Sequence, residues 1–289
     1  MAKKKNSKSV MEKYKTAKLI TLATIIFTGI YIIVVNKIEH NQAMQTCPKP
    51  RQAGNPNLYS QYFEDYILSI VFSDTKNGTY IDVGANNPDI NSVTKHFYLK
   101  GWRGINIEPI ESLHKQLQKQ RPGDINLNIG ISNSPGELEF FQISHKSYNN
   151  GDAFSTFDKN LISKMKAEDG WAHKQYKVPV KTLNEVLKTH PLDNITFLSI
   201  DVEGMEKSVL EGLDLTKHRP VVFIIEATDQ DTSEPTHHTW EPILLNNNYD
   251  FVLFDRLNRY YLAKEHSQQL KPKFEEAKKC AKCYDSILK

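Results

Sequence analysis

Short apolar runs alternate with amphipathic segments from about residue 58 to residue 263. Buried strands are predicted at six runs of apolar and β-branched residues, 79–83, 103–107, 125–131, 137–143, 196–200 and 221–225. Helices are predicted at segments with helical spacing, 59–72, 90–100, 110–120, 183–189 and 204–212. Strands alternating with helices favour an α/β fold with a parallel, doubly wound sheet. A closing pair at 249–254 and 259–263 makes one strand antiparallel if it forms a hairpin.

Two stretches interrupt this regularity. Residues 144–177 are polar with scattered aromatic residues, and residues 227–248 show no readable pattern. A long irregular stretch inside a compact domain is typical of a lid or a substrate loop, or of disorder. We therefore expect the substrate pocket to depend on these two segments.

Polar residues follow the predicted strands at the points where the strands end, at Asp82, Glu108, Ser132, Asp201 and Glu226. In an open parallel sheet, ligands bind beyond the carboxyl ends of the strands. The alternative is that the acids only cap the helices that follow, as Asp often does. Because all five fall at strand ends, the pattern predicts one shared ligand site at this edge of the sheet.

The segment GTYIDVGANNP, residues 78–88, predicts a buried strand that runs into a tight loop. Gly84 allows the backbone to pass close to a ligand. Glu108 ends the second strand, where an acid can accept hydrogen bonds from ribose hydroxyls. The sequence has neither the G-x-G-x-x-G pattern nor a G-x-x-x-x-G-K-[ST] loop, both of which bind phosphates. These features favour S-adenosylmethionine, which has a ribose but no phosphate.

The amino-terminal region predicts a membrane anchor. Residues 19–35 are uncharged and mostly apolar, just long enough for a helix to cross a thin bilayer. A cleaved signal peptide is the alternative, but no clear small-residue cleavage site follows Val35. Residues 1–18 form a basic tail with seven lysines and one glutamate, which predicts a cytosolic amino terminus and a lumenal or extracytoplasmic domain. Residues 36–57 read as a flexible stalk.

Charge and cysteine content narrow the partners. The net charge is +3, while residues 1–18 carry +6 and residues 264–289 carry +3, so the middle of the chain carries −6. An acidic middle argues against nucleic acid as the main partner. Three cysteines do not define a disulfide framework, and the pairing of Cys280 with Cys283 stays open. Oligomeric state cannot be read from the sequence.

Residues 59–265 resemble the FkbM-type methyltransferases. The matching pieces are YSQYFEDYIL, YIDVGANNP, GWRGINIEP, ISNSPGELEFF, FSTF with VKTLNEVL, and FLSIDVEGMEKSVLEGLD. The resemblance implies a seven-stranded Rossmann-like sheet over residues 58–265, followed by a basic tail at 266–289. It also implies S-adenosylmethionine as cofactor and methyl transfer to an oxygen, often of a sugar or a polyketide.

The resemblance assigns roles to particular residues. Asp82, Gly84 and Asn86 would line the methionine and ribose part of the cofactor, Glu108 would hold the ribose hydroxyls, and Ser132 would border the adenine.

For the reaction itself, the resemblance points to Asp201 and Glu203 after the fourth parallel strand. We predict that Asp201 is the general base, since a carboxylate beside the acceptor hydroxyl can take its proton. His173 is a second candidate base. Ser155, Thr156 and Phe157 would help to form the substrate pocket.

Two alternatives stay open. Asp201, Glu203 and Glu226 offer hard oxygen ligands for Mg²⁺, but nothing in their spacing demands a metal, and none is predicted. The other alternative is a non-catalytic trafficking adaptor, as in some membrane-anchored animal proteins with this fold. It gains weight because S-adenosylmethionine is made in the cytosol, whereas the charge bias places the domain across the membrane.

Overall fold

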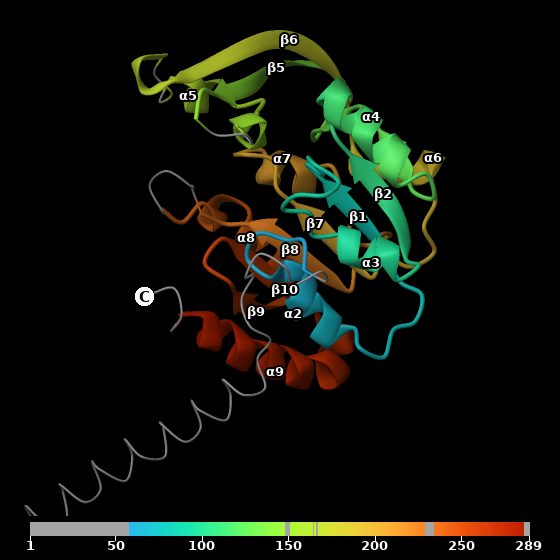
Figure 1. Ribbon diagram of the computed structural model, residues 1–289. Coiled ribbons are helices and arrows are strands. Elements are labelled where there is room, and N and C mark those ends of the chain that lie inside the picture. Colours follow the sequence, from blue (N-terminus) through green and yellow to red (C-terminus); the bar gives the residue numbers. More distant parts are fainter. Residues whose placement is uncertain (1–57, 148–150, 164, 166, 229–233, 286–289) are drawn as a thin grey trace, which may run out of the picture. The chain divides into compact units, whose positions relative to one another are not determined.

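The computed structural model describes residues 58–147, 151–163, 165, 167–228 and 234–285 (Figure 1). The site lies within one compact unit, Arg51–Ala281. No helix in the described ranges is long and apolar enough to cross a bilayer. The predicted tail 1–18, anchor 19–35 and stalk 36–57 lie outside those ranges.

A seven-stranded sheet forms the centre of this compact unit. Its spatial order is β3 (Ile125–Leu127), β2 (Arg103–Ile107), β1 (Thr79–Val83), β7 (Phe197–Ile200), β8 (Val222–Glu226), β10 (Asn258–Ala263) and β9 (Tyr249–Phe254). The first five strands are mutually parallel, whereas β10 runs antiparallel to both β8 and β9. The predicted doubly wound sheet with an antiparallel last strand is confirmed.

Helices cover both faces of this sheet because the central strands are apolar on both sides. Buried side chains of α2 (Glu64–Val71), α3 (Lys95–Leu99) and α9 (Ser267–Asp285) form one core with Tyr80 and Phe197. Those of α6 (Leu183–Thr189), α7 (Glu206–Glu211) and α8 (Glu241–Asn246) form the other core with Ile81 and Leu198. Neighbouring residues of one strand therefore enter different cores, as the pleat requires.

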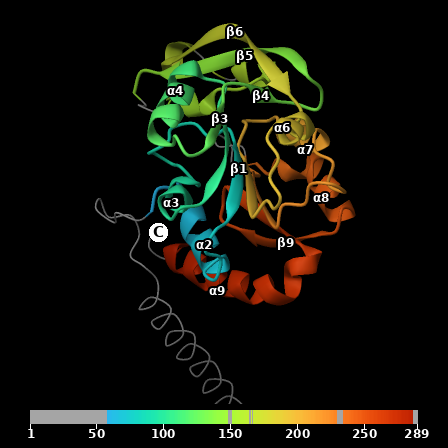
Figure 2. The ribbon, with the colours of Figure 1, turned by 90° about the vertical axis from the view of Figure 1, so that its right-hand side faces the viewer.

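A second sheet of three strands lies over one end of the first (Figure 2). It consists of β4 (Gly130–Ile131), β6 (Trp171–Lys181) and β5 (Gly136–His145). The remaining elements are α4 (Glu111–Gln120), α5 (Lys159–Ile162), η1 (Gly151–Phe154), η2 (Ala167–Asp169), η3 (His237–Thr239) and η4 (Lys264–His266). Of these, η1, α5 and η2 lie in the connection between β5 and β6.

The structure corrects the predicted third strand, 125–131. Only Ile125–Leu127 joins the main sheet, as β3, while Gly130 and Ile131 pair with β6. The side chain of Asn128 explains the break, because its Nδ2 donates to the carbonyl oxygens of Glu108 and Pro109, 2.9 Å away in each case. These bonds turn the chain out of the sheet directly after β3.

Part of the irregular stretch 144–177 is also a strand. Residues 171–177 form the first part of β6, which pairs with β5 from Trp171 to Val180. Most of their side chains are exposed, so backbone pairing holds the strand without an apolar alternation that the sequence could show. The fold also extends past residue 265, since Leu270, Phe274 and Ala277 of α9 are buried against the sheet.

Candidate active site

One cavity lies at the carboxyl ends of β2, β1 and β7. Six of the seven predicted site residues line it, namely Asp82, Gly84, Asn86, Glu108, Asp201 and Glu203. They come from three adjacent parallel strands and the loops that follow these strands. The expectation that strand ends bring these groups together agrees with this geometry.

Gly84 allows the first loop to pass directly against the end of β7. Its φ of +84° lies in the left-handed region, and a Cβ added there would stand 1.8 Å from the carbonyl oxygen of Asp201. The amide nitrogens of Gly84 and Ala85 both donate to the carbonyl oxygen of Ile107. Only glycine meets these constraints, and the close approach brings the ends of β2, β1 and β7 together.

Glu108 presents a fixed carboxylate to the cavity. It is almost completely buried, and its two oxygens accept backbone N–H bonds from Asn86 at 2.8 Å and Ile110 at 2.7 Å. Burial raises the pKa of Glu108 to about 7, with further contributions from the charges of Asp152 and Asp82. Each oxygen retains a lone pair, so the carboxylate can still accept bonds from the hydroxyls of a ligand.

Asp82 belongs to a buried polar network below the cavity. Its Oδ2 accepts a 2.7 Å bond from Thr94 Oγ1, which in turn accepts one from Arg121 Nη1. Arg121 is 2% exposed and also donates to Ser92 Oγ and to the Pro88 carbonyl oxygen. The guanidinium therefore fixes the loop after β1 from below. Burial raises the pKa of Asp82.

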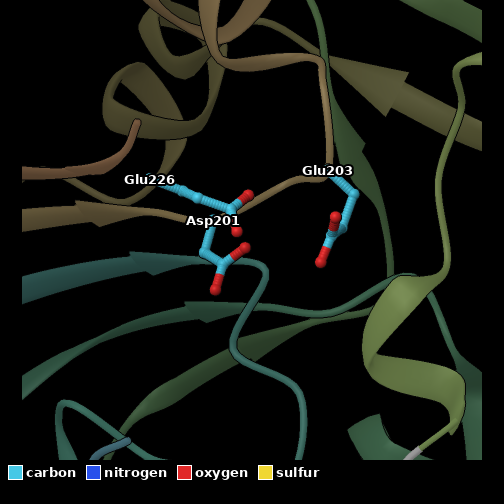
Figure 3. Close-up of side chains that lie close together, drawn as sticks. All are labelled: Asp201, Glu203 and Glu226. Atoms are coloured by element: carbon cyan, nitrogen blue, oxygen red, sulfur yellow. The ribbon is translucent and has the colours of Figure 1, made fainter. Parts of the chain in front are cut away.

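Asp201, Glu203 and Glu226 form a carboxylate cluster, with one oxygen of each lying within 4.8 Å of the others (Figure 3). The carboxyl groups of Asp201 and Glu226 are therefore close neighbours. Burial raises the pKa of Asp201 to about 6, so Asp201 is largely ionised at neutral pH and can accept a proton.

The same oxygens are of the kind that binds Mg²⁺. The prediction that no metal is required stays a prediction.

The loop that carries Glu203 is held in an uncommon conformation. Glu203 has a φ of +50°, which is unfavourable for a residue with a side chain. Its carbonyl oxygen accepts a 2.7 Å bond from Thr156 Oγ1, and the next amide, that of Gly204, donates to Glu206 Oε1. Thr156 is fully buried, so it braces this loop, whereas its neighbours Ser155 and Phe157 line the cavity as expected.

One part of the cavity lining is apolar, and we call it the apolar slot. It consists of Ile110, Ile131, Phe140 and Phe157, and the rings of Phe140 and Phe157 pack against each other with their centroids 4.7 Å apart. Phe140 belongs to β5, so the small sheet forms one wall of this slot. A flat apolar ring attached to a ribose held at Glu108 would enter it.

Two candidates lie elsewhere. Ser132 does not line the cavity; its hydroxyl lies 3.1 Å from that of Ser208 on α7, and Ile129, Gly130 and Ile131 line the wall instead. The lining of the cavity therefore gives no support to a role for Ser132 beside the adenine, and that role stays a prediction. His173 is exposed on β6, with its ring against Phe141, and does not line the cavity.

Five polar residues of the cavity lining were missed from the sequence, namely Gln61, Asn91, Ser92, Asp152 and Ser199. Asp152 belongs to η1, inside the stretch that showed no pattern. Gln61 belongs to the quoted segment YSQYFEDYIL, which gave a signal but suggested no role.

The parallel sheet with its one antiparallel strand, and the acid-lined cavity at its edge, define a Rossmann-like fold of the methyltransferase type. A family model, the methyltransferase FkbM domain, matches residues 82–251, which is more than half of the chain. The chain belongs to this family. No curated protein matches the sequence.

Proposed function

We propose that the protein is an S-adenosylmethionine-dependent methyltransferase that acts on a hydroxyl oxygen. The charge of the cavity carries this proposal. Five carboxylic acids line it, Asp82, Glu108, Asp152, Asp201 and Glu203, and the described lining includes no Lys, Arg or His. Such a cavity attracts a cation and repels a pyrophosphate. S-adenosylmethionine has a positively charged sulfonium and no phosphate.

The shape of the cavity supports a definite orientation of the cofactor. The apolar slot at Ile110, Phe140 and Phe157 would take the adenine. The lone pairs of Glu108 would accept bonds from the ribose hydroxyls. The sulfonium would then lie near Gly84 and Asp201, where the first loop passes β7 most closely.

The proposed reaction is an in-line displacement. The acceptor oxygen attacks the methyl carbon, the oxygen–carbon bond forms, the carbon–sulfur bond breaks, and S-adenosylhomocysteine leaves with the electron pair on sulfur. Asp201 takes the hydroxyl proton as the oxygen loses its lone pair to the new bond. Alignment of oxygen and methyl carbon supplies much of the rate, since the sulfonium is already a good leaving group. Glu203 faces the same space and would orient the acceptor.

The acceptor and the location of the domain are also parts of the proposal. The family resemblance favours a sugar or another small hydroxyl compound, which would approach past Phe154 and Ser155. Residues 19–35 would anchor the protein in a membrane, and the lysines of residues 1–18 favour a cytosolic amino terminus. A lumenal domain then requires a supply of cofactor across that membrane.

A series of ligands that differ in charge tests the proposal. Sinefungin has an ammonium group where the sulfonium stands, S-adenosylhomocysteine is uncharged there, and NAD has a pyrophosphate. Calorimetry of the full-length chain in detergent should show binding of the first two, sinefungin more tightly, and no binding of NAD. Equal binding of NAD would contradict the charge argument. Absence of binding by both adenosyl compounds would favour the non-catalytic adaptor.

A further inference from the structure

The segment before α2 is held in place although it is not helical. Asp65, which is fully buried, accepts bonds from Ser60 Oγ at 2.5 Å and from the amide of Tyr59 at 2.6 Å. Glu64 Oε2 accepts a bond from the amide of Tyr62 at 2.7 Å. Two consecutive buried acids thus fix residues 59–63, which include Phe63 in the left-handed conformation with φ of +67°.

This segment lies at the Asp201 end of the cavity. Glu64 Oε1 accepts a 2.9 Å bond from Asn258 Nδ2, and Asn258 stands opposite Glu226 in the pairing of β10 with β8. A carboxylate oxygen of Glu226 in turn lies within 4.8 Å of one of Asp201. These contacts place the segment on the β8 side of Asp201, whereas Glu108 stands at the end of β2 on the other side of β1.

Gln61 is the residue of this segment that lines the cavity. It is exposed, and its carboxamide makes no hydrogen bond to any described residue. A carboxamide offers two N–H donors and no charge. An uncharged N–H donor can bind the anionic part of a ligand. It also leaves the negative charge of the five carboxylic acids in place, so the cavity still attracts the cationic part of the same ligand.

We propose that Gln61 binds the α-carboxylate of the methionine moiety of the cofactor. The inference rests on the proposed function, which places adenosine at Glu108 and leaves the amino-acid end to extend past β1 toward Gln61. It also adds a binding element outside the matched family region, since Gln61 precedes residue 82. The segment that follows the predicted stalk would thereby complete the cofactor site.

Two ligands that differ only in the amino-acid end can show whether Gln61 binds that end or supports the cofactor site as a whole. S-adenosylhomocysteine has the amino-acid end, and 5′-methylthioadenosine lacks it. We expect Gln61→Ala to weaken the binding of S-adenosylhomocysteine by about tenfold, as loss of a hydrogen bond to a charged group does. Binding of methylthioadenosine should stay within about twofold of wild type. Gln118→Ala is the matched control, an exposed glutamine of α4 that does not line the cavity.

Calorimetry on the full-length chain in detergent can decide whether Gln61 binds the carboxylate. Unchanged affinity of Gln61→Ala for S-adenosylhomocysteine would overturn the assignment, and so would an equal loss for both ligands. Gln61→Glu offers a second variant, which should bind S-adenosylhomocysteine more weakly than Gln61→Ala because it sets a like charge against the carboxylate. If the wild-type chain binds neither ligand, the proposed function itself fails.

Discussion

Substitution of Gly84 tests how closely the first loop must approach β7. In Gly84→Ala the new Cβ would stand 1.8 Å from the carbonyl oxygen of Asp201, whereas real Cβ contacts essentially never fall below 3.0 Å. The two backbones would have to separate by more than 1 Å. This movement strains the bond from the Asp201 amide to the Val83 carbonyl oxygen, 3.0 Å in length.

The loss of folding stability in Gly84→Ala has two parts. The left-handed φ of Gly84 costs about 1–2 kcal/mol for any residue with a Cβ, and overpacking against a rigid backbone costs a further 1–3 kcal/mol, roughly. Gly101→Ala is the control, since Gly101 also has a left-handed φ, +94°, but no atom lies within 4 Å of the added Cβ. Gly101→Ala should therefore lose only the stability that the left-handed φ costs.

Urea unfolding of both variants measures the difference. We expect Gly84→Ala to lose about 2–5 kcal/mol and Gly101→Ala about 1–2 kcal/mol. Binding of S-adenosylhomocysteine should weaken only in Gly84→Ala, because only that loop lines the cavity. Equal losses of stability in the two variants, with cofactor affinity intact, would refute the close approach.

Three further predictions concern the base, a buried acid and the topology. Asp201→Asn should lower methyl transfer from labelled cofactor by about a hundredfold or more and leave S-adenosylhomocysteine affinity within about twofold; retained turnover would exclude Asp201 as the base. Burial and the charge of Asp255 raise the pKa of Glu64 to about 8 from 4.5. The stability that protonated Glu64 contributes is thus complete below about pH 4.5 and is lost as the pH rises through 8. Between pH 6 and pH 8.5, the free energy of unfolding measured in urea should therefore fall less in Glu64→Gln than in wild type. An equal fall in the two proteins would contradict this prediction. Protease added outside intact microsomal vesicles should spare the carboxyl terminus, and its digestion would overturn the proposed orientation.

The sequence predicts the fold best at the buried parallel strands and at the residues that directly follow them. The apolar runs of β1 and β2 were predicted with their observed bounds, since strands buried on both faces have a strong local signal. Asp82, Gly84, Glu108 and Asp201 were predicted because parallel strands must end at one edge. These positions follow from local pattern together with one rule of topology.

The remaining positions depend on contacts between distant parts of the chain. Phe140 reaches the cavity because the small sheet folds over the large one, and no local pattern reports that placement. Gln61 is positioned through Glu64 and Asn258, which are 194 residues apart. Ser132 lies outside the cavity because the chain leaves the main sheet at Asn128, through side-chain bonds to carbonyl oxygens that periodicity does not show.

The central claim is that carboxylates at the ends of adjacent strands hold an adenosyl cofactor. The most direct measurement is the affinity of S-adenosylhomocysteine for wild type, Asp82→Ala and Glu108→Ala, compared in full-length chains whose folding is verified by circular dichroism. We expect each substitution to weaken binding at least tenfold, about 1.4 kcal/mol. Wild-type affinity in both folded variants would contradict the account.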